Sequence, residues 1–89
     1  MKAIVSVFAK DRIGIIADVT NLISSMNINI LDLSQTVMDN IFTMIMLVDT
    51  STTDKTFEDI RTALLDEGEK RNISVRIQRE DIFEAMHRI

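Results

Sequence analysis

The chain has 89 residues, 46% of them hydrophobic and 27% charged, and its formal net charge is −4. This length fits one domain, and an acidic domain repels phosphate backbones, so we expect no direct binding of nucleic acid. The sequence has no cysteine, which excludes disulfides, thiolate nucleophiles and cysteine-based metal sites. Its longest apolar run is far shorter than the ~20 residues that span a bilayer, and its first residues do not resemble a signal peptide. We therefore expect a cytoplasmic protein without membrane attachment.

The first quarter of the chain predicts a strand followed by a helix. Residues 3–9 are β-branched and apolar without helical spacing, which favours a buried strand. A polar break at residues 10–14 follows, and Asn27 suits a left-handed position after the helix. Between them, apolar residues recur at three- and four-residue steps and predict an amphipathic helix of about three turns: Ile15, Ile16, Val19, Leu22, Ile23 and Met26.

The next segment predicts a hairpin of two strands, residues 28–38 and 41–48, joined by a two-residue turn at Asp39-Asn40. Asx residues tolerate the positive φ of such a turn, and the turn sets the register of the strands. The expected opposing pairs are Met38–Ile41, Val37–Phe42, Gln35–Met44, Leu33–Met46 and Leu31–Val48. The face expected under the helices carries Leu31, Leu33, Val37, Phe42, Met44, Met46 and Val48. The other face carries Asp32, Ser34, Thr36, Thr43, Ile45 and Leu47.

The second half predicts another helix, a strand and a short tail. An apolar stripe at Phe57, Ile60 and Leu64, with Leu65 as a further candidate, predicts a helix that runs to about Arg71. Gly68 either ends this helix early or lies inside it at a cost of ~1 kcal/mol. The last strand has alternating apolar residues, and the tail at residues 81–89 places its apolar residues on one side of a short helix: Ile73, Val75 and Ile77, then Ile82, Phe83, Met86 and Ile89.

The order of elements predicts an α+β fold of the ferredoxin-like βαββαβ type. Right-handed crossovers give a four-stranded antiparallel sheet with both helices on one face, and a short C-terminal helix follows. We assign residues 1–79 to the domain and residues 80–89 to a C-terminal helical tail. Ile45 and Leu47, on the sheet face away from the helices, favour a homodimer or larger assembly unless the tail covers them.

The residues that could carry chemistry mostly have a structural interpretation. An RNA-recognition surface needs aromatic and basic side chains on its central strands, and only Phe8 and Phe42 fall there, neither in a basic context. His87, the only histidine, is interpreted as a surface residue of the tail. The methionines are interpreted as core filling and the acidic residues of the second helix as surface charges: Met38, Met44 and Met46; Glu58, Asp59, Asp66, Glu67 and Glu69. We therefore expect no catalytic centre, no metal site and no cofactor.

The informative segment is the link between the first strand and the first helix. The N–H groups at a helix start are unpaired and its dipole is positive there, which suits an anionic group such as an amino-acid carboxylate. Gly14 lets a ligand approach the backbone closely. The alternative is structural: Asp11 caps the helix and Gly14 eases the turn.

Residues 7–17, Val-Phe-Ala-Lys-Asp-Arg-Ile-Gly-Ile-Ile-Ala, resemble the opening of ACT domains, a strand followed by Asp-Arg-Pro-Gly, then Leu or Ile and Ala. Residues 26–30, Met-Asn-Ile-Asn-Ile, resemble the family's next helix-to-strand segment. The resemblance covers about residues 1–79. The tail resembles that of small stand-alone ACT proteins. These proteins are in turn distantly similar to the glycine cleavage system transcriptional repressor. Ile13 stands in place of the family's usual Pro, so the loop loses a fixed φ.

The resemblance implies a function and a set of site residues. ACT domains commonly bind small amino acids between paired domains, where the first loop of one meets the start of the second strand of its neighbour. Carried over by position, the candidates are Asp11, Arg12, Gly14 and Ile15 on one side and Asn29 and Ile30 on the other. The expected function is a regulatory homodimer that binds an amino acid without catalysis and acts on a protein target. The alternative is a ligand-free protein–protein interaction or dimerisation module.

Overall fold

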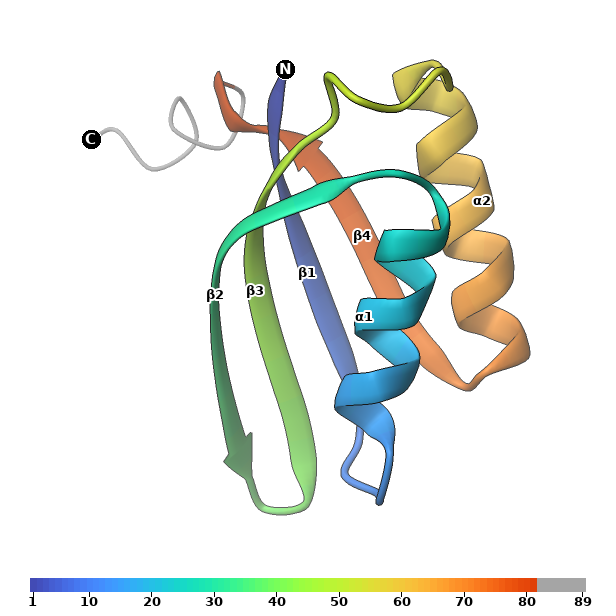
Figure 1. Cartoon of the computed structure of the whole chain (residues 1–89). Helices are drawn as coiled ribbons and strands as arrows, with labels where there is room; N and C mark the ends of the chain where they lie inside the picture. The colour runs from blue at the N-terminus through green and yellow to red at the C-terminus, as the bar shows by residue number, and fades with distance from the viewer. Residues whose placement is uncertain (82–89) are drawn as a thin grey trace.

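The computed structural model describes residues 1–81, which form a four-stranded antiparallel sheet and two helices. The elements are β1 (Lys2–Lys10), α1 (Ile15–Ser25), β2 (Asn29–Met38), β3 (Ile41–Asp49), α2 (Phe57–Lys70) and β4 (Ile73–Arg79). The strands lie in the order β2-β3-β1-β4, and both helices cover the same face of the sheet (Figure 1). The predicted ferredoxin-like fold is confirmed. Residues 82–89 of the predicted tail, including His87, lie outside the described residues.

The core lies between the helices and the two central strands. Val5 and Val7 of β1 and Met44 and Met46 of β3 point to the helix side and are fully buried, because successive side chains of a strand alternate between the faces. The helices and β4 contribute further buried residues to this layer: Ile15, Val19, Leu22 and Ile23 from α1, Ile60 and Leu64 from α2, and Ile73, Val75 and Ile77 from β4. Within residues 1–81, neither helix is long and apolar enough to cross a membrane.

Gly68 lies inside α2, so the alternative in which it ends the helix early is wrong. The helix begins after Thr56, whose Oγ1 accepts a hydrogen bond from the Asp59 N–H at 3.1 Å. A Cβ atom on Gly68 would lie 2.7 Å from the carbonyl oxygen of Ile73 and 3.1 Å from Cγ2 of Val75. The absence of a side chain therefore lets α2 approach β4 closely.

The hairpin confirms the predicted turn and most of the predicted register. Asp39 and Asn40 have φ values of 50° and 67°, as a two-residue turn of this kind requires. Four of the five expected pairs are present: Met38–Ile41, Val37–Phe42, Gln35–Met44 and Leu33–Met46. The fifth is wrong, because Ile30 and not Leu31 opposes Val48. A β-bulge between Ile30 and Asp32 adds Leu31 as an extra residue on β2 and shifts the pairing by one.

The expected burial of β2 is also wrong. Leu31, Leu33 and Val37, expected under the helices, are 44%, 43% and 53% exposed. The reason is that β2 is an edge strand, and Figure 1 shows both helices displaced from it toward β4. Met38 is 72% exposed and does not fill the core, whereas Met44 and Met46 do. The helix-side surface of β2 is therefore left open beside α1.

Candidate functional site

The loop from β1 to α1 is held at both ends. The Asp11 N–H donates to the carbonyl oxygen of Asn40 at 2.8 Å, which ties the start of the loop to the hairpin turn. Gly14 ends the loop as the residue before the helix, with φ 85°. This left-handed conformation costs a glycine little, whereas a residue with a Cβ atom is strained there. The loop therefore holds Asp11 beside the start of α1.

The start of α1 has no side-chain cap within residues 1–81, so the alternative in which Asp11 caps the helix is wrong. The first helical hydrogen bond runs from the Asp18 N–H to the Gly14 carbonyl oxygen at 3.0 Å. The Ile15 N–H donates to the Arg12 carbonyl oxygen at 3.3 Å. By helix geometry, the N–H groups of Ile16 and Ala17 have no acceptor inside the helix. The positive end of the helix dipole is thus free to receive an anionic group.

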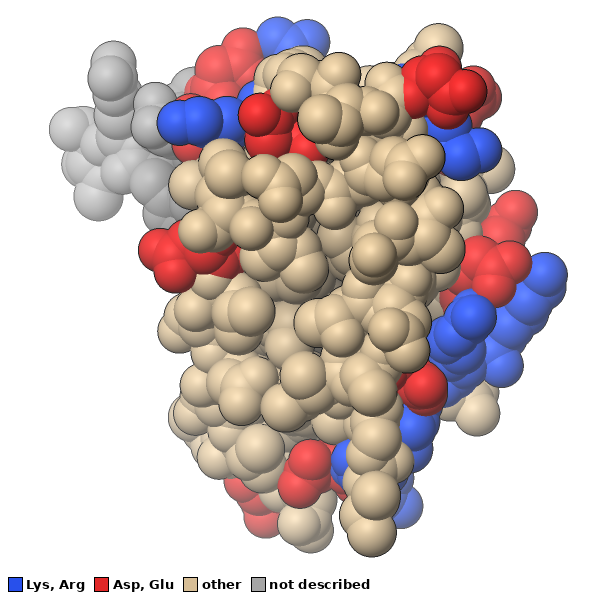
Figure 2. All heavy atoms as spheres, viewed as in Figure 1, with Lys and Arg blue, Asp and Glu red and all other residues tan. Residues whose placement is uncertain are grey.

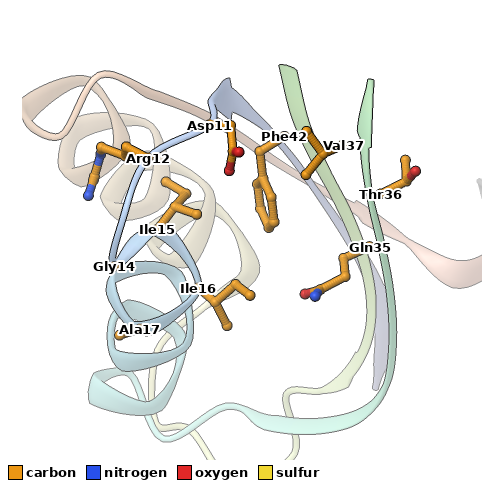
Figure 3. A pocket seen from close by; sticks show the side chains of 10 residues that line it. All are labelled: Asp11, Arg12, Gly14, Ile15, Ile16, Ala17, Gln35, Thr36, Val37 and Phe42. Carbon is orange, nitrogen blue, oxygen red and sulfur yellow. The ribbon is translucent and has the colours of Figure 1, made fainter. Parts of the chain in front are cut away.

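A hollow of about 390 Å³ separates the start of α1 from the β2–β3 hairpin. Its size falls within the range of roughly 300–1,000 Å³ that small-molecule sites occupy. It is lined by Asp11, Arg12, Gly14, Ile15, Ile16, Ala17, Gln35, Thr36, Val37 and Phe42. In Figure 3 the Asp11 carboxylate and the Gln35 side chain point into the space between α1 and the strands, with Ile15, Ile16 and Phe42 around them. We call this hollow the α1 pocket.

Arg12 belongs to the rim of the α1 pocket. Its Nη2 atom lies 2.6 Å from Oδ2 of Asp18, and both side chains are 42% exposed. Figure 3 shows its side chain directed away from Gln35 and Phe42. An exposed ion pair of this kind contributes about 0–1 kcal/mol. Arg12 therefore offsets the charge of Asp18 near the helix start and leaves Asp11 as the charged group that points into the pocket.

The six candidate residues fall into two groups within one chain. Asp11, Arg12, Gly14 and Ile15 line the α1 pocket. Asn29 and Ile30 lie at the other end of α1, where Asn29 is exposed beside Asn27 and Thr52 and Ile30 packs against the core. The structure does not bring the two groups together in one chain. The expectation that Asn29 and Ile30 of a second chain complete the site stays a prediction.

The sequence analysis missed the strand side of the α1 pocket, above all Gln35, Val37 and Phe42. The signal was present in the predicted register, which places Gln35 and Val37 on the helix-facing side opposite Met44 and Phe42. What was missing was the position of β2 at the edge of the sheet, which leaves those side chains uncovered. The predicted ferredoxin-like topology implies that β2 is an edge strand. The predicted register and the predicted topology, taken together, therefore identify the strand side of the α1 pocket.

The middle of the face that adjoins the α1 pocket carries little charge. Figure 2 shows that the face over β2, β3 and α1 is mostly uncharged, whereas the basic and acidic side chains gather at its two ends and along the side of α2. Exposed apolar side chains adjoin the pocket, including Ile13, which is fully exposed, and Ile16 at 42%. Asp11 and the Arg12–Asp18 ion pair therefore lie beside exposed apolar side chains.

The fold and this loop define an ACT domain, and the chain belongs to the ACT domain family, whose model matches residues 2–78. ACT domains are typically regulatory modules that bind ligands. Among relatives, the chain is 46% identical over 89 residues to a UPF0237 protein of Listeria innocua, with 100% of both chains covered. It is 47% identical over 88 residues to a UPF0237 protein of Methanocaldococcus jannaschii, with 99% of this chain and 98% of that protein covered.

Two solved structures place the fold among known proteins. An ACT domain protein from Streptococcus pneumoniae superposes with a TM-score of 0.83 at 41% identity, with 98% of each chain covered. A putative glycine cleavage system transcriptional repressor superposes with a TM-score of 0.72 at 20% identity, with 86% of this chain and 44% of that chain covered. At that identity the second likeness concerns the fold alone.

Proposed function

We propose that this chain is a cytoplasmic regulatory domain that binds a small free amino acid in the α1 pocket and acts as a homo-oligomer, without catalysis. The observation that carries the proposal is that three kinds of polar group surround one hollow. They are the N–H groups of Ile16 and Ala17 at the uncapped start of α1, the Asp11 carboxylate and the Gln35 amide. A free amino acid has an anionic group, a cationic group and a side chain. The pocket offers a complementary partner for each.

Each group of the ligand has a defined place in this proposal. The carboxylate accepts hydrogen bonds from the N–H groups of Ile16 and Ala17 at the positive end of α1. The ammonium donates to the Asp11 carboxylate, a charge-assisted hydrogen bond. The Gln35 amide can donate to the carboxylate or accept from the ammonium. Ile15 and Phe42 provide apolar surface for the ligand's side chain.

The second half of the proposed site is Asn29–Ile30 of another copy. Asn29 is exposed at the start of β2, and β2 is an edge strand whose outer backbone groups can pair with a second chain. A site divided between two copies couples binding to assembly, because a ligand that prefers the dimer must stabilise it. Such coupling lets a domain without catalysis pass a signal to a protein target.

A second candidate function is a ligand-free interaction module. Its support is the apolar surface beside the α1 pocket, where Ile13 is fully exposed and Val37 is 53% exposed. Exposed apolar side chains that adjoin one another are typical of protein interfaces. In this case the α1 pocket receives a side chain of a partner in place of a free amino acid.

A thermal-shift assay with the common amino acids tests the proposal. We expect one of them to raise the Tm of the wild type by on the order of 5–10 °C at ten times its Kd. We expect Asp11→Ala to lose this rise, and the control Asp66→Ala, an exposed substitution on α2, to retain it. An equal rise in Asp11→Ala would show that the site is misplaced. A wild type that responds to no amino acid would leave the ligand-free module as the function.

A further inference from the structure

The sheet has a second free edge at β4, on the side opposite β2. Within residues 1–81, β4 pairs only with β1, so the backbone groups that point away from β1 have no strand partner. Its helix-side residues Ile73, Val75 and Ile77 are buried, and Figure 1 shows α2 running beside it. An edge strand of this kind is a template for a further strand, because it offers a row of unpaired N–H and C=O groups.

A groove of about 580 Å³ follows this edge between α2 and β4. Leu65, Asp66 and Glu69 of α2 form one wall, and Ile73 and Val75 of β4 contribute to the other. Leu65 is apolar and yet 38% exposed. A strand added to β4 would place every second side chain in this groove, because the side chains of a strand alternate between the faces of the sheet. The groove therefore offers Leu65 as apolar surface to such a strand.

The carboxylates of the groove have no basic partner. Within the described chain, the side chains of Asp66 and Glu69 are exposed and make no ion pair or hydrogen bond. The basic residues at the end of α2 are already paired with Glu67, since Lys70 Nζ lies 3.2 Å and Arg71 Nη1 lies 2.5 Å from its carboxylate oxygens. The groove therefore presents two carboxylates to a segment placed beside β4, and a basic side chain of that segment would pair with them.

The other side of β4 carries the opposite charge. Ser74, Arg76 and Gln78 alternate with the buried residues of β4, so they lie on the face of the sheet away from the helices, here called the outer face. Arg76 is exposed, and within residues 1–81 its guanidinium makes no ion pair. The two faces of β4 thus differ in charge. An added strand matches both faces when it carries a basic side chain toward α2 and an acidic side chain toward Arg76.

These charges disfavour a second copy of the chain as the added strand. Arg76 is the central residue of β4, so in a two-fold symmetric pairing centred on this strand Arg76 would oppose its own counterpart. Like charges directly opposite one another destabilise a strand pair. The other free edge of a second copy does not match either, because β2 contains no Lys or Arg. A segment of a different protein can supply the charges that this edge requires.

We propose that the groove between α2 and β4 binds an extended segment of another protein as a fifth strand. In this complex an apolar side chain of the segment covers Leu65, and a basic side chain pairs with Asp66 and Glu69. On the outer face an acidic side chain pairs with Arg76. Backbone hydrogen bonds to β4 provide affinity, and the side-chain contacts select the partner. The inference goes beyond the proposed function, because it concerns a different surface and needs no ligand in the α1 pocket.

NMR of the full chain tests the proposal with a designed peptide as the probe. The acetylated and amidated peptide Lys-Thr-Val-Asp-Val-Thr-Lys has its Lys and Val side chains on one face of a strand and Asp on the other, and its palindromic order suits either strand direction. At millimolar concentration we expect it to shift the backbone amide resonances of β4 and Leu65 and to leave those of β2 in place. The charge-reversed peptide Asp-Thr-Val-Lys-Val-Thr-Asp should bind about tenfold more weakly. Shifts at β2 alone, or no shift at β4, would overturn the proposal.

Two charge variants separate the groove from the overall charge of the chain. We expect Glu69→Lys to abolish the preference for the peptide that ends in Lys. Asp54→Lys makes the same change of charge in the loop before α2, outside the groove, and should keep the preference. Both positions are exposed, so neither substitution disturbs the core. Retention of the preference in Glu69→Lys, or its loss in both variants, would overturn the proposal.

Discussion

At the scale of single residues, the two glycines meet different geometric needs. Gly14 has a positive φ of 85°, and a Cβ atom added to it would contact nothing within 4 Å. Its requirement is conformational, and it was predictable from its place between a strand and a helix. Gly68 is limited by space, because an added Cβ atom would lie 2.7 Å from the Ile73 carbonyl oxygen. The sequence left open whether Gly68 ends α2 early or lies inside it. The distance between α2 and β4 decides this question, and sequence spacing does not contain that distance.

The space available at Gly68 gives a stability prediction. We expect Gly68→Ala to lower the free energy of unfolding by about 1–3 kcal/mol, because overpacking against β4 outweighs the ~1 kcal/mol that alanine gains in a helix. Urea unfolding measures this change. Its neighbour Glu69→Ala, an exposed substitution on the same helix, should change the free energy by less than about 0.5 kcal/mol. A Gly68→Ala variant more stable than the wild type would contradict the tight packing of α2 on β4.

Glu67 gives a pH-dependence prediction. Hydrogen bonds from Arg71 and then from Lys70 hold the pKa of Glu67 below its ordinary value of 4.5. A carboxyl group whose pKa is lowered by folding stabilises the protein above its unfolded pKa, and this stability is lost as the pH falls through the folded pKa. We expect Glu67→Gln to have a lower Tm than the wild type above pH 4.5, with the difference disappearing on acidification. A difference in Tm that does not depend on pH would show that the ion pairs contribute nothing.

At the scale of elements, the hairpin shows what a sequence pattern can and cannot determine. The Asp39-Asn40 turn determined four register pairs, because the turn type and the period of two together fix which residues meet. The bulge at Leu31 was not predictable, because an extra residue in an apolar strand leaves the local alternation of residue types ambiguous. The exposure of β2 depends on where α1 and α2 pack, which is a property of the whole fold.

The turn of this hairpin contacts the candidate site, because the Asn40 carbonyl oxygen accepts a hydrogen bond from the Asp11 N–H. We expect Asn40→Val to lower the free energy of unfolding by about 1–2 kcal/mol, because a β-branched residue is strained at φ 67°. Asn40→Gly keeps the turn and serves as the matched control, with a stability equal to or above that of the wild type. Equal stabilities of the two variants in thermal unfolding would contradict the assigned turn conformation.

At the scale of the whole molecule, the chain presents two apolar regions on opposite sides of its sheet. One surrounds the α1 pocket and the exposed edge strand β2, and the other is the outer face over β1 and β3. We assign the first to ligand binding and assembly. The loop half of the candidate site was predictable because Asp11–Ile15 is contiguous in sequence. The strand half was not identified, because Gln35 and Phe42 reach the pocket only through the packing of separate elements.

Isothermal titration calorimetry on the wild type, Asp11→Ala and Asn29→Ala, with the amino acid that stabilises the wild type, tests the central claim most directly. We expect binding to the wild type and its loss in both variants, because in the proposed site Asp11 accepts from the ammonium and Asn29 of a second copy completes the pocket. Light scattering on the same samples should show a dimer when the ligand is bound. Equal binding to all three proteins, or binding by a monomer, would contradict a shared amino-acid site at the start of α1.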